Sequence, residues 1–137
     1  MQNYFQVHME QDALKGISAL GLAHMGDGVF ELLVRSWLCV HGKATSTNLH
    51  RATVSYVAAP AQARQMDRML PLLSEEELAL YRRGRNAHVH GVPKHATAGE
   101  YAKATGLECL FGALFLQGKT ARINELFQLT MEDDHAL

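Results

Sequence analysis

Apolar residues recur every three or four positions along most of this chain, which is the spacing of one face of an α-helix. The longest such stretch starts near Leu22 and ends at His41 and Gly42, where a glycine follows the last periodic residue. Only residues 53–58 have some strand propensity, and their helical neighbours outweigh it. Further helices are predicted at about 48–57, 60–71, 74–87, 97–115 and 120–129. We therefore predict an all-α fold of about six to seven helices.

Two segments carry the signal that opens a helix. Ser74 and Glu77, and again Thr97 and Glu100, have the spacing of a capping box, in which each side chain accepts a hydrogen bond from the backbone N–H of the other residue. The glutamates at 75–77 are then expected to stabilise the helix through its dipole rather than to take part in catalysis.

The length of the chain bounds its organisation. It has 137 residues, of which 47% are hydrophobic, enough for one domain with a core and too few for two. We expect a single domain over 1–137, with 1–11 and 130–137 as loose termini. A helical stretch from about Asp12 either ends near Gly21 or runs into the following helix.

Composition argues against export and against a membrane span. Residues 1–15 are mixed polar and do not resemble a signal peptide, and no run of about 18 uncharged apolar residues occurs. Cys39 and Cys109 have apolar neighbours and are expected to be reduced core residues of a cytoplasmic protein. A net charge of −1 argues against indiscriminate binding to nucleic acid, although basic residues in the middle of the chain allow a local basic face.

Asp27 lies within this long apolar helix, between Gly26 and Gly28. A buried carboxylate costs several kcal/mol unless a cation, a metal or strong donors compensate it. Each glycine in a helix costs about 1 kcal/mol relative to alanine. We therefore expect Asp27 to have a partner, and this backbone to be approached closely by a second helix or by a nucleic acid.

Glu108 is a second acid within an apolar helix. Two such acids on separate helices can face one another, and a hydrated Mg²⁺ between them would compensate both charges and form a site for phosphodiester hydrolysis. From the spacing alone, Glu108 could equally well be a core acid that is hydrogen-bonded to a Tyr or an Arg and binds no metal. Glu31 can share the face of Asp27, but a pair with Arg35 is the favoured interpretation.

The segment from Arg82 to Lys94 can neutralise phosphates without reading sequence, through Arg83, Arg85 and Lys94. Gly84 would let the backbone come close to such a ligand, whereas the alternative is a solvated helix end that complements the helix dipole. A loop is predicted at 88–96, and its three histidines lack the Cys or acid ligands that would accompany a zinc site: His88, His90 and His95.

Several stretches together resemble one known family. Leu22-Ala-His-Met-Gly-Asp27 resembles the signature helix of ribonuclease III in the form typical of its Mini-ribonuclease III branch. Ala104-Thr-Gly-Leu-Glu-Cys-Leu-Phe-Gly-Ala113 resembles the second acidic helix of that family. Three further parts match the branch, and the resemblance covers about 20–127: Asn48-Leu-His-Arg51 with Val57-Ala-Ala-Pro-Ala-Gln-Ala63, Arg82-Arg-Gly-Arg-Asn-Ala87, and Val92-Pro-Lys94.

The resemblance implies a homodimeric ribonuclease III-type endonuclease that cleaves double-stranded RNA. It implies Asp27 and Glu108 as the catalytic residues and Mg²⁺ ligands. Two further carboxylates of the family are replaced here by Ala23 and Thr105, as is typical of the branch, and His24 stands where an aromatic residue contributes to the dimer contact. The expected RNA-binding residues are His50, Arg51, Arg83, Arg85, Asn86 and Lys94.

The implied task is maturation of the 5′ and 3′ ends of precursor 23S ribosomal RNA. Because a separate RNA-binding domain does not fit in this length, the dimer is expected to grip duplex RNA by shape and phosphate contacts across the minor groove. A ribosomal protein on the precursor particle is a candidate partner. The replaced acids keep one alternative open, which is a non-catalytic helical RNA-binding module for ribosome assembly.

Overall fold

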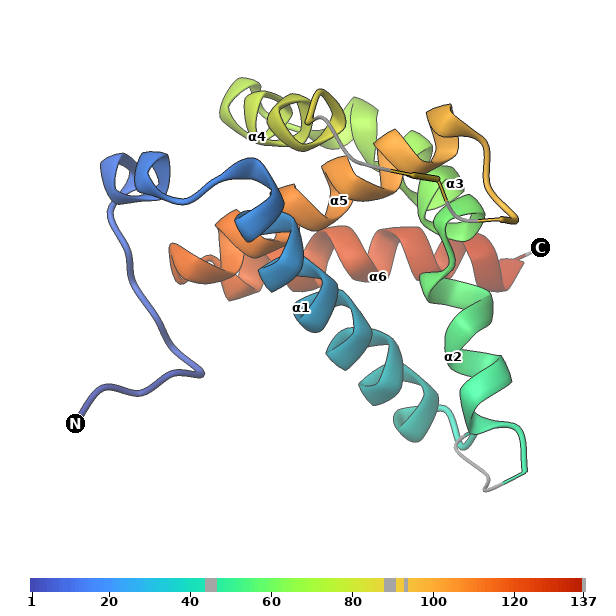
Figure 1. Ribbon diagram of the computed structural model, residues 1–137. Helices are drawn as coiled ribbons and strands as arrows, with labels where there is room; N and C mark the ends of the chain where they lie inside the picture. Colours follow the sequence, from blue (N-terminus) through green and yellow to red (C-terminus); the bar gives the residue numbers. More distant parts are fainter. Residues whose placement is uncertain (44–46, 88–90, 93, 137) are drawn as a thin grey trace.

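The structure is a computed structural model that describes residues 1–43, 47–87, 91, 92 and 94–136, the last five by their backbone alone. These residues form α-helices and short 3-10 helices and no strand, which confirms the all-α prediction. None of the described helices is long and apolar enough to cross a membrane. The elements in chain order are η1 (Gln11–Gly16), α1 (Ala19–Val40), α2 (Leu49–Val57), α3 (Ala59–Met69), η2 (Leu70–Leu72), α4 (Glu75–Arg85), α5 (Ala98–Leu116) and α6 (Thr120–Ala136) (Figure 1).

α5 is the helix on which the others are assembled. It packs against α1, α3, α4 and α6, and most of its residues from Ala104 to Leu114 are buried. A helix that is apolar on all sides needs such a position, because no face of it can be left to water. Figure 1 shows α1 crossing α5 on one side while α4 lies on the other.

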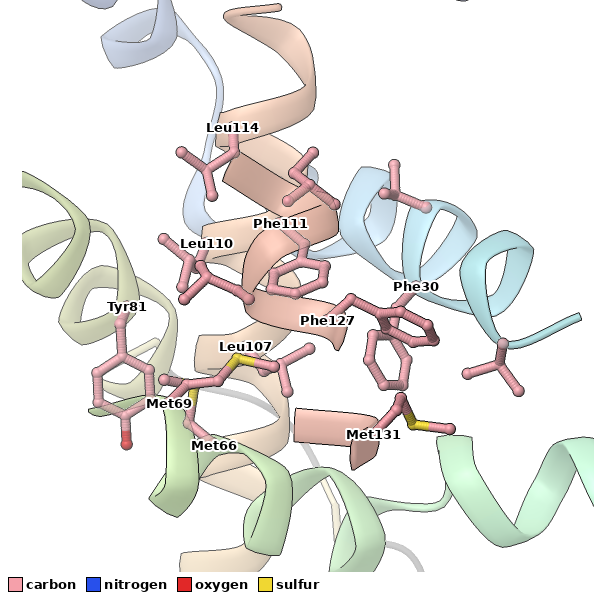
Figure 2. Close-up of a cluster of buried hydrophobic side chains, with 14 of the residues drawn as sticks. Phe30, Met66, Met69, Tyr81, Leu107, Leu110, Phe111, Leu114, Phe127 and Met131 are labelled. Carbon is pink, nitrogen blue, oxygen red and sulfur yellow. The ribbon is translucent and has the colours of Figure 1, made fainter. Parts of the chain in front are cut away.

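The hydrophobic core lies where α1, α3, α5 and α6 meet (Figure 2). The ring of Phe30 stands edge-on to Phe111 and to Phe127, at centroid distances of 5.7 and 5.9 Å. This is the preferred arrangement of aromatic pairs. The same cluster contains further large buried side chains: Met66, Met69, Tyr81, Leu107, Leu110, Leu114 and Met131.

Both predicted capping boxes form. The backbone N–H of Glu77 donates to Ser74 Oγ at 3.2 Å, and the N–H of Ser74 donates to Glu77 Oε1 at 2.9 Å. The corresponding distances between Glu100 and Thr97 are 3.1 and 2.8 Å. α1 also ends as predicted, and Gly42 follows it with φ 67°, a backbone conformation that glycine adopts without strain.

The helical stretch predicted from Asp12 is separate from α1. It forms the 3-10 helix η1, after which Ile17 is extended and Ser18 caps α1 by accepting from the backbone N–H of Gly21 at 2.9 Å. A serine at this position satisfies one of the free amides at the helix start, which explains why the two helices do not merge.

The last helix is longer than the sequence predicted. We expected it to end near Leu129, but α6 continues to Ala136. Thr130 and Met131 are buried, and Met131 belongs to the main core cluster. Packing of this turn against the core therefore extends the helix into a segment whose acidic composition indicated a frayed end.

Two smaller predictions have different outcomes. Cys109 is buried as predicted, whereas Cys39 is exposed near the end of α1, so its assignment to the core was wrong. The predicted loop histidines His88 and His90 lie outside the described residues.

A partly buried ion pair that the sequence did not predict joins α4 to α6. Arg122 Nε lies 2.8 Å from Glu77 Oε2, and the guanidinium also donates to Glu77 Oε1 at 2.9 Å and to the carbonyl oxygen of Leu72 at 2.7 Å. These hydrogen bonds from Arg122 lower the pKa of Glu77 below its ordinary value. Glu77 thus has a structural role, as expected, but one that reaches beyond its own helix.

Candidate active site

The backbones of α1 and α5 touch, because each helix carries a glycine where they cross. A Cβ on Gly26 would lie 1.6 Å from the carbonyl oxygen of Glu108, and a Cβ on Gly112 would lie 2.0 Å from the carbonyl oxygen of Leu22. A side chain at either position would therefore push the helices apart. Because Leu22 meets Gly112 while Gly26 meets Glu108, the helices run in opposite directions at the crossing. Of the two partners predicted for this backbone, a second helix and a nucleic acid, the helix is the one that approaches Gly26.

The crossing brings Asp27 and Glu108 together. Asp27 follows Gly26 directly, and the two carboxyl groups share a hydrogen bond. Asp27 is exposed and Glu108 is half-buried, so the pair opens to solvent from the side of α1. None of the ion pairs between described residues includes either carboxyl group.

The pair carries more negative charge than its surroundings compensate. Burial, the charge of Asp27 and the hydrogen bond to Asp27 together raise the pKa of Glu108 from 4.5 to about 8, with burial the largest cause. Near neutral pH Glu108 therefore retains its proton. A cation bound by both groups would favour the ionised form of Glu108 and lower its pKa.

The donor set fits a divalent metal ion. Mg²⁺ prefers carboxylate oxygens and is commonly held by one or two carboxylates while it keeps several waters. Glu108 would contribute an oxygen from the half-buried side of such a site and Asp27 one from the exposed side. The alternative of a core acid bonded to a Tyr or an Arg does not describe Glu108, because its hydrogen-bond partner is Asp27.

Two details differ from the sequence-based expectation. Asp27 is exposed, so the need for a compensating charge arises from the burial of Glu108 and not from that of Asp27. A Cβ on Gly28 would meet no atom within 4 Å. The packing of this chain therefore requires glycine at position 26 and not at position 28.

Glu31 belongs to the surface and not to the site. Its Oε2 lies 3.5 Å from Nη2 of Arg35, and the two side chains are 43% and 64% exposed. This confirms the favoured interpretation as a pair within one turn of a helix.

Gly84, which we expected to let a ligand approach, is instead the point where α5 approaches α4. A Cβ on Gly84 would lie 2.5 Å from Cys109 Cβ and 2.7 Å from the carbonyl oxygen of Thr105. Gly106 of α5 packs in the same way against the ring of Tyr81. A Cβ on Gly106 would lie 2.5 Å from Cε1 of that ring. The glycine of the basic segment is thus explained by helix packing.

Arg83 is engaged within the protein. Its guanidinium donates to the carbonyl oxygen of Leu14 at 3.3 Å and also to that of Ile17, at the end of η1. These bonds hold the segment that leads into α1. They occupy one N–H on each of the two terminal nitrogens of Arg83, a residue that we predicted to bind RNA.

Arg85 and Asn86 are exposed at the end of α4. Arg85 Nε donates to Asn86 Oδ1 at 3.2 Å, and the Arg85 guanidinium lies over the ring of Tyr81 at 5.6 Å from its centroid. The pair is therefore held in place at the surface, with the outer face of the guanidinium open to solvent.

The remaining predicted RNA-binding residues lie on other elements. Lys94 is exposed ahead of α5, and His50 and Arg51 are exposed in the first turn of α2. Figure 1 places α2 and α4 far apart, at the lower right and the upper left of the molecule. The structure thus brings Asp27 to Glu108 and Arg85 to Asn86, but it does not bring His50 and Arg51 to the end of α4.

Comparison with known proteins places this site in a family. The model of the ribonuclease III domain matches residues 20–119, a span that contains both acids of the pair. The Mini-ribonuclease 3 of Symbiobacterium thermophilum is 44% identical over 109 residues, which cover 80% of this chain and 84% of that protein. This chain is a member of the Mini-ribonuclease III branch of the ribonuclease III family. It is an endoribonuclease.

Other Mini-ribonuclease III proteins extend the match over nearly the whole chain. The protein of Enterococcus faecalis is 41% identical, and the match covers 82% of this chain and 86% of that protein. The protein of Clostridium tetani is 34% identical, and the match covers 96% of this chain and 88% of that protein. A crystal structure of a protein from Fusobacterium nucleatum superposes with a TM-score of 0.78 at 27% identity, covering 85% of this chain and 93% of that one. The ribonuclease III family acts on double-stranded RNA, uses a divalent metal ion and functions as dimers.

Proposed function

We propose that this protein is a Mg²⁺-dependent, homodimeric endoribonuclease that cleaves double-stranded RNA and matures the 5′ and 3′ ends of precursor 23S ribosomal RNA in the cytoplasm. One observation carries the proposal: the contact between Gly26 and Glu108 brings the carboxyl groups of Asp27 and Glu108 so close together that Asp27 raises the pKa of Glu108. The names of the relatives support the reaction class.

Asp27 and Glu108 would hold the ion through their carboxylate oxygens. When bound, Mg²⁺ supplies a Lewis acid that polarises the phosphodiester and promotes attack by water. The protein chain itself contributes by holding the two carboxyl groups in place. Because the backbone of Gly26 touches that of Glu108, the relative position of the two carboxyl groups is fixed before the substrate arrives.

The exposed basic residues supply the contacts to RNA. Arg85 and Asn86 would meet phosphates at the end of α4, and Lys94 would meet phosphates ahead of α5. His50 and Arg51 would meet another part of the duplex at α2. Contacts to phosphate position a duplex without reading its sequence, so shape must contribute to the choice of site. Arg83 is left out of this set because its guanidinium already binds backbone carbonyls.

The exposed side of α1 would form the contact between the two chains. Leu20, His24 and Leu32 are exposed on this helix, with Leu20 and Leu32 at 45% and 56% exposure. A second copy would cover these side chains and place its own Asp27 near the same duplex.

The dimer can be tested by measuring molar mass in solution over a range of protein concentrations. Leu32→Glu should shift the protein to a monomer, because it places a charge in the apolar contact. Leu129→Glu is the matched control, since Leu129 is an exposed leucine of α6, outside this face. A native protein that is monomeric at all concentrations would contradict this part of the proposal.

We propose that a ribosomal protein on the precursor particle is a partner that strengthens the binding of the dimer to RNA. With a net charge of −1, the chain has little general attraction for RNA. Cleavage of the precursor particle should then be faster than cleavage of the same RNA without protein.

Cleavage of a labelled duplex from precursor 23S ribosomal RNA tests the function directly. The native protein should cut with Mg²⁺ and not with EDTA, and Asp27→Asn and Glu108→Gln should fold, bind the duplex and fail to cut. Glu31→Gln is the matched control, because it neutralises an acid of the same helix outside the site. If the native protein binds RNA without cutting it, even on the precursor particle, the non-catalytic assembly module is the better description.

A further inference from the structure

A surface ion pair joins α3 to α5 close to the end of α4. Lys103 Nζ of α5 lies 2.7 Å from Oδ1 of Asp67 on α3, and the two side chains are 39% and 53% exposed. The hydrogen bond from Lys103 to Asp67 is the largest cause that raises the pKa of Lys103 above its ordinary value. Lys103 therefore keeps its positive charge at neutral pH, and solvent reaches both partners of the pair.

Tyr81 connects Lys103 to the exposed guanidinium of Arg85. Its ring stands at the edge of the buried core cluster (Figure 2) and is 2% exposed. The Arg85 guanidinium lies over this ring at 5.6 Å from its centroid, and Tyr81 is close enough to Lys103 to contribute to the rise of its pKa. The two cations are therefore neighbours across one aromatic side chain, at the surface where α4 ends.

Asp67 is an acid among basic side chains. Arg64 precedes it by three residues on α3, so the two lie on the same side of that helix, and Arg64 is exposed. The acid one turn before Lys103 on α5, Glu100, accepts a hydrogen bond from the backbone N–H of Thr97 at 2.8 Å, which turns it toward the start of the helix. Asp67 is thus the carboxylate that meets the Lys103 ammonium group.

We propose, on the basis of the proposed function, that Lys103 and Arg85 bind neighbouring phosphates of the RNA duplex and that Asp67 occupies the phosphate position at Lys103 until RNA arrives. Carboxylate and phosphate both present anionic oxygens to an ammonium group, so one can replace the other. The exchange is easy, because an exposed ion pair contributes little to stability and is screened by salt. Asp67 therefore competes with every RNA and weakens non-specific binding.

Binding of a labelled RNA duplex to the full-length protein tests this competition, measured by fluorescence anisotropy in EDTA. Lys103→Ala should weaken binding and reduce its salt dependence by about one phosphate contact. Asp67→Asn should tighten binding roughly two- to fivefold, the range that corresponds to an exposed ion pair. In a protein that already carries Lys103→Ala, Asp67→Asn should lose this gain, because the cation that it releases is absent.

Matched controls separate this competition from a general effect of charge and from a structural role. Asp12 and Lys15 form another exposed ion pair, at 3.3 Å on η1, and Asp12→Asn and Lys15→Ala should leave RNA binding nearly unchanged. Lys103→Arg keeps the charge and should bind RNA like the native protein. Since all of these side chains reach solvent, each variant should melt within a few degrees of the native protein.

Two results would overturn the inference while the proposed function stands. In one, the native protein cuts the duplex and Lys103→Ala binds it with native affinity and native salt dependence. In the other, the gain from Asp67→Asn persists in full without Lys103 or is matched by Asp12→Asn, so that it reflects net charge alone. A native protein that neither binds nor cuts the duplex would overturn the proposed function together with the inference.

Discussion

Replacing Gly26 with alanine should force α1 and α5 apart. The new Cβ would lie 1.6, 2.5 and 2.9 Å from the carbonyl oxygen, carbonyl carbon and Cα of Glu108, whereas carbon atoms in contact are about 3.5–4 Å apart. All three are backbone atoms, so no side-chain rotation relieves the overlap and α5 must move by roughly 2 Å. Overpacking that a core can absorb costs about 1–3 kcal/mol. We expect Gly26→Ala to lower the free energy of unfolding by about 3 kcal/mol or more. This loss already includes the gain of about 1 kcal/mol from replacing a helical glycine.

Thermal unfolding followed by far-ultraviolet circular dichroism in EDTA measures this effect. For a chain of this size, a loss of about 3 kcal/mol lowers the melting temperature by roughly 10 °C. Gly28→Ala is the matched control, because its Cβ meets no atom within 4 Å. It should raise the melting temperature by a few degrees, through a gain of about 0.5–1 kcal/mol.

Cleavage assays on the same two variants connect the crossing to function. Gly26→Ala should lose most of its activity, because a displacement of about 1 Å in a catalytic site can cost roughly 100-fold in rate. A Gly26→Ala protein that melts and cuts like the native protein would refute the argument that the backbones touch. A Gly28→Ala protein that is stable but inactive would show that RNA or the second chain uses the space above Gly28.

Three further predictions follow from other contacts. Because the pKa of Glu108 is raised from 4.5 to about 8, the folded state holds one proton more than the unfolded state between these pH values. The free energy of unfolding of the metal-free protein should therefore fall as the pH rises from about 4.5 to about 8. Urea unfolding in EDTA should show this fall in the native protein and not in Glu108→Gln. Arg83→Ala should lower the free energy of unfolding in denaturant by about 2 kcal/mol, because it removes two hydrogen bonds. Arg85→Ala should change that free energy by less than about 0.5 kcal/mol. It should instead reduce the salt dependence of RNA binding, measured by fluorescence anisotropy, by about one phosphate contact. Arg122→Met should cost about 2–3 kcal/mol because it leaves Glu77 partly buried without its cation, and a second change, Glu77→Gln, should restore part of that loss.

The sequence by itself determined the helices, most of their ends and the two acids of the site. The capping boxes at Ser74 and Thr97 and the glycine after α1 act within one turn of the chain, so they can be recognised without knowledge of the fold. Asp27 and Glu108 stand out for a similar reason, since each is an acid in an otherwise apolar helix.

The tertiary structure alone decided which residues meet. The glycines around Asp27 indicated a close approach, but only the packed helices show that α5 comes to Gly26 and leaves Gly28 open. Arg83 lies in a basic segment, and its engagement with η1 depends on a contact almost 70 positions away in sequence. The extension of α6 likewise depends on where Met131 packs. These features are set by distance in space between residues far apart in the chain, and no local pattern of residue types records that distance.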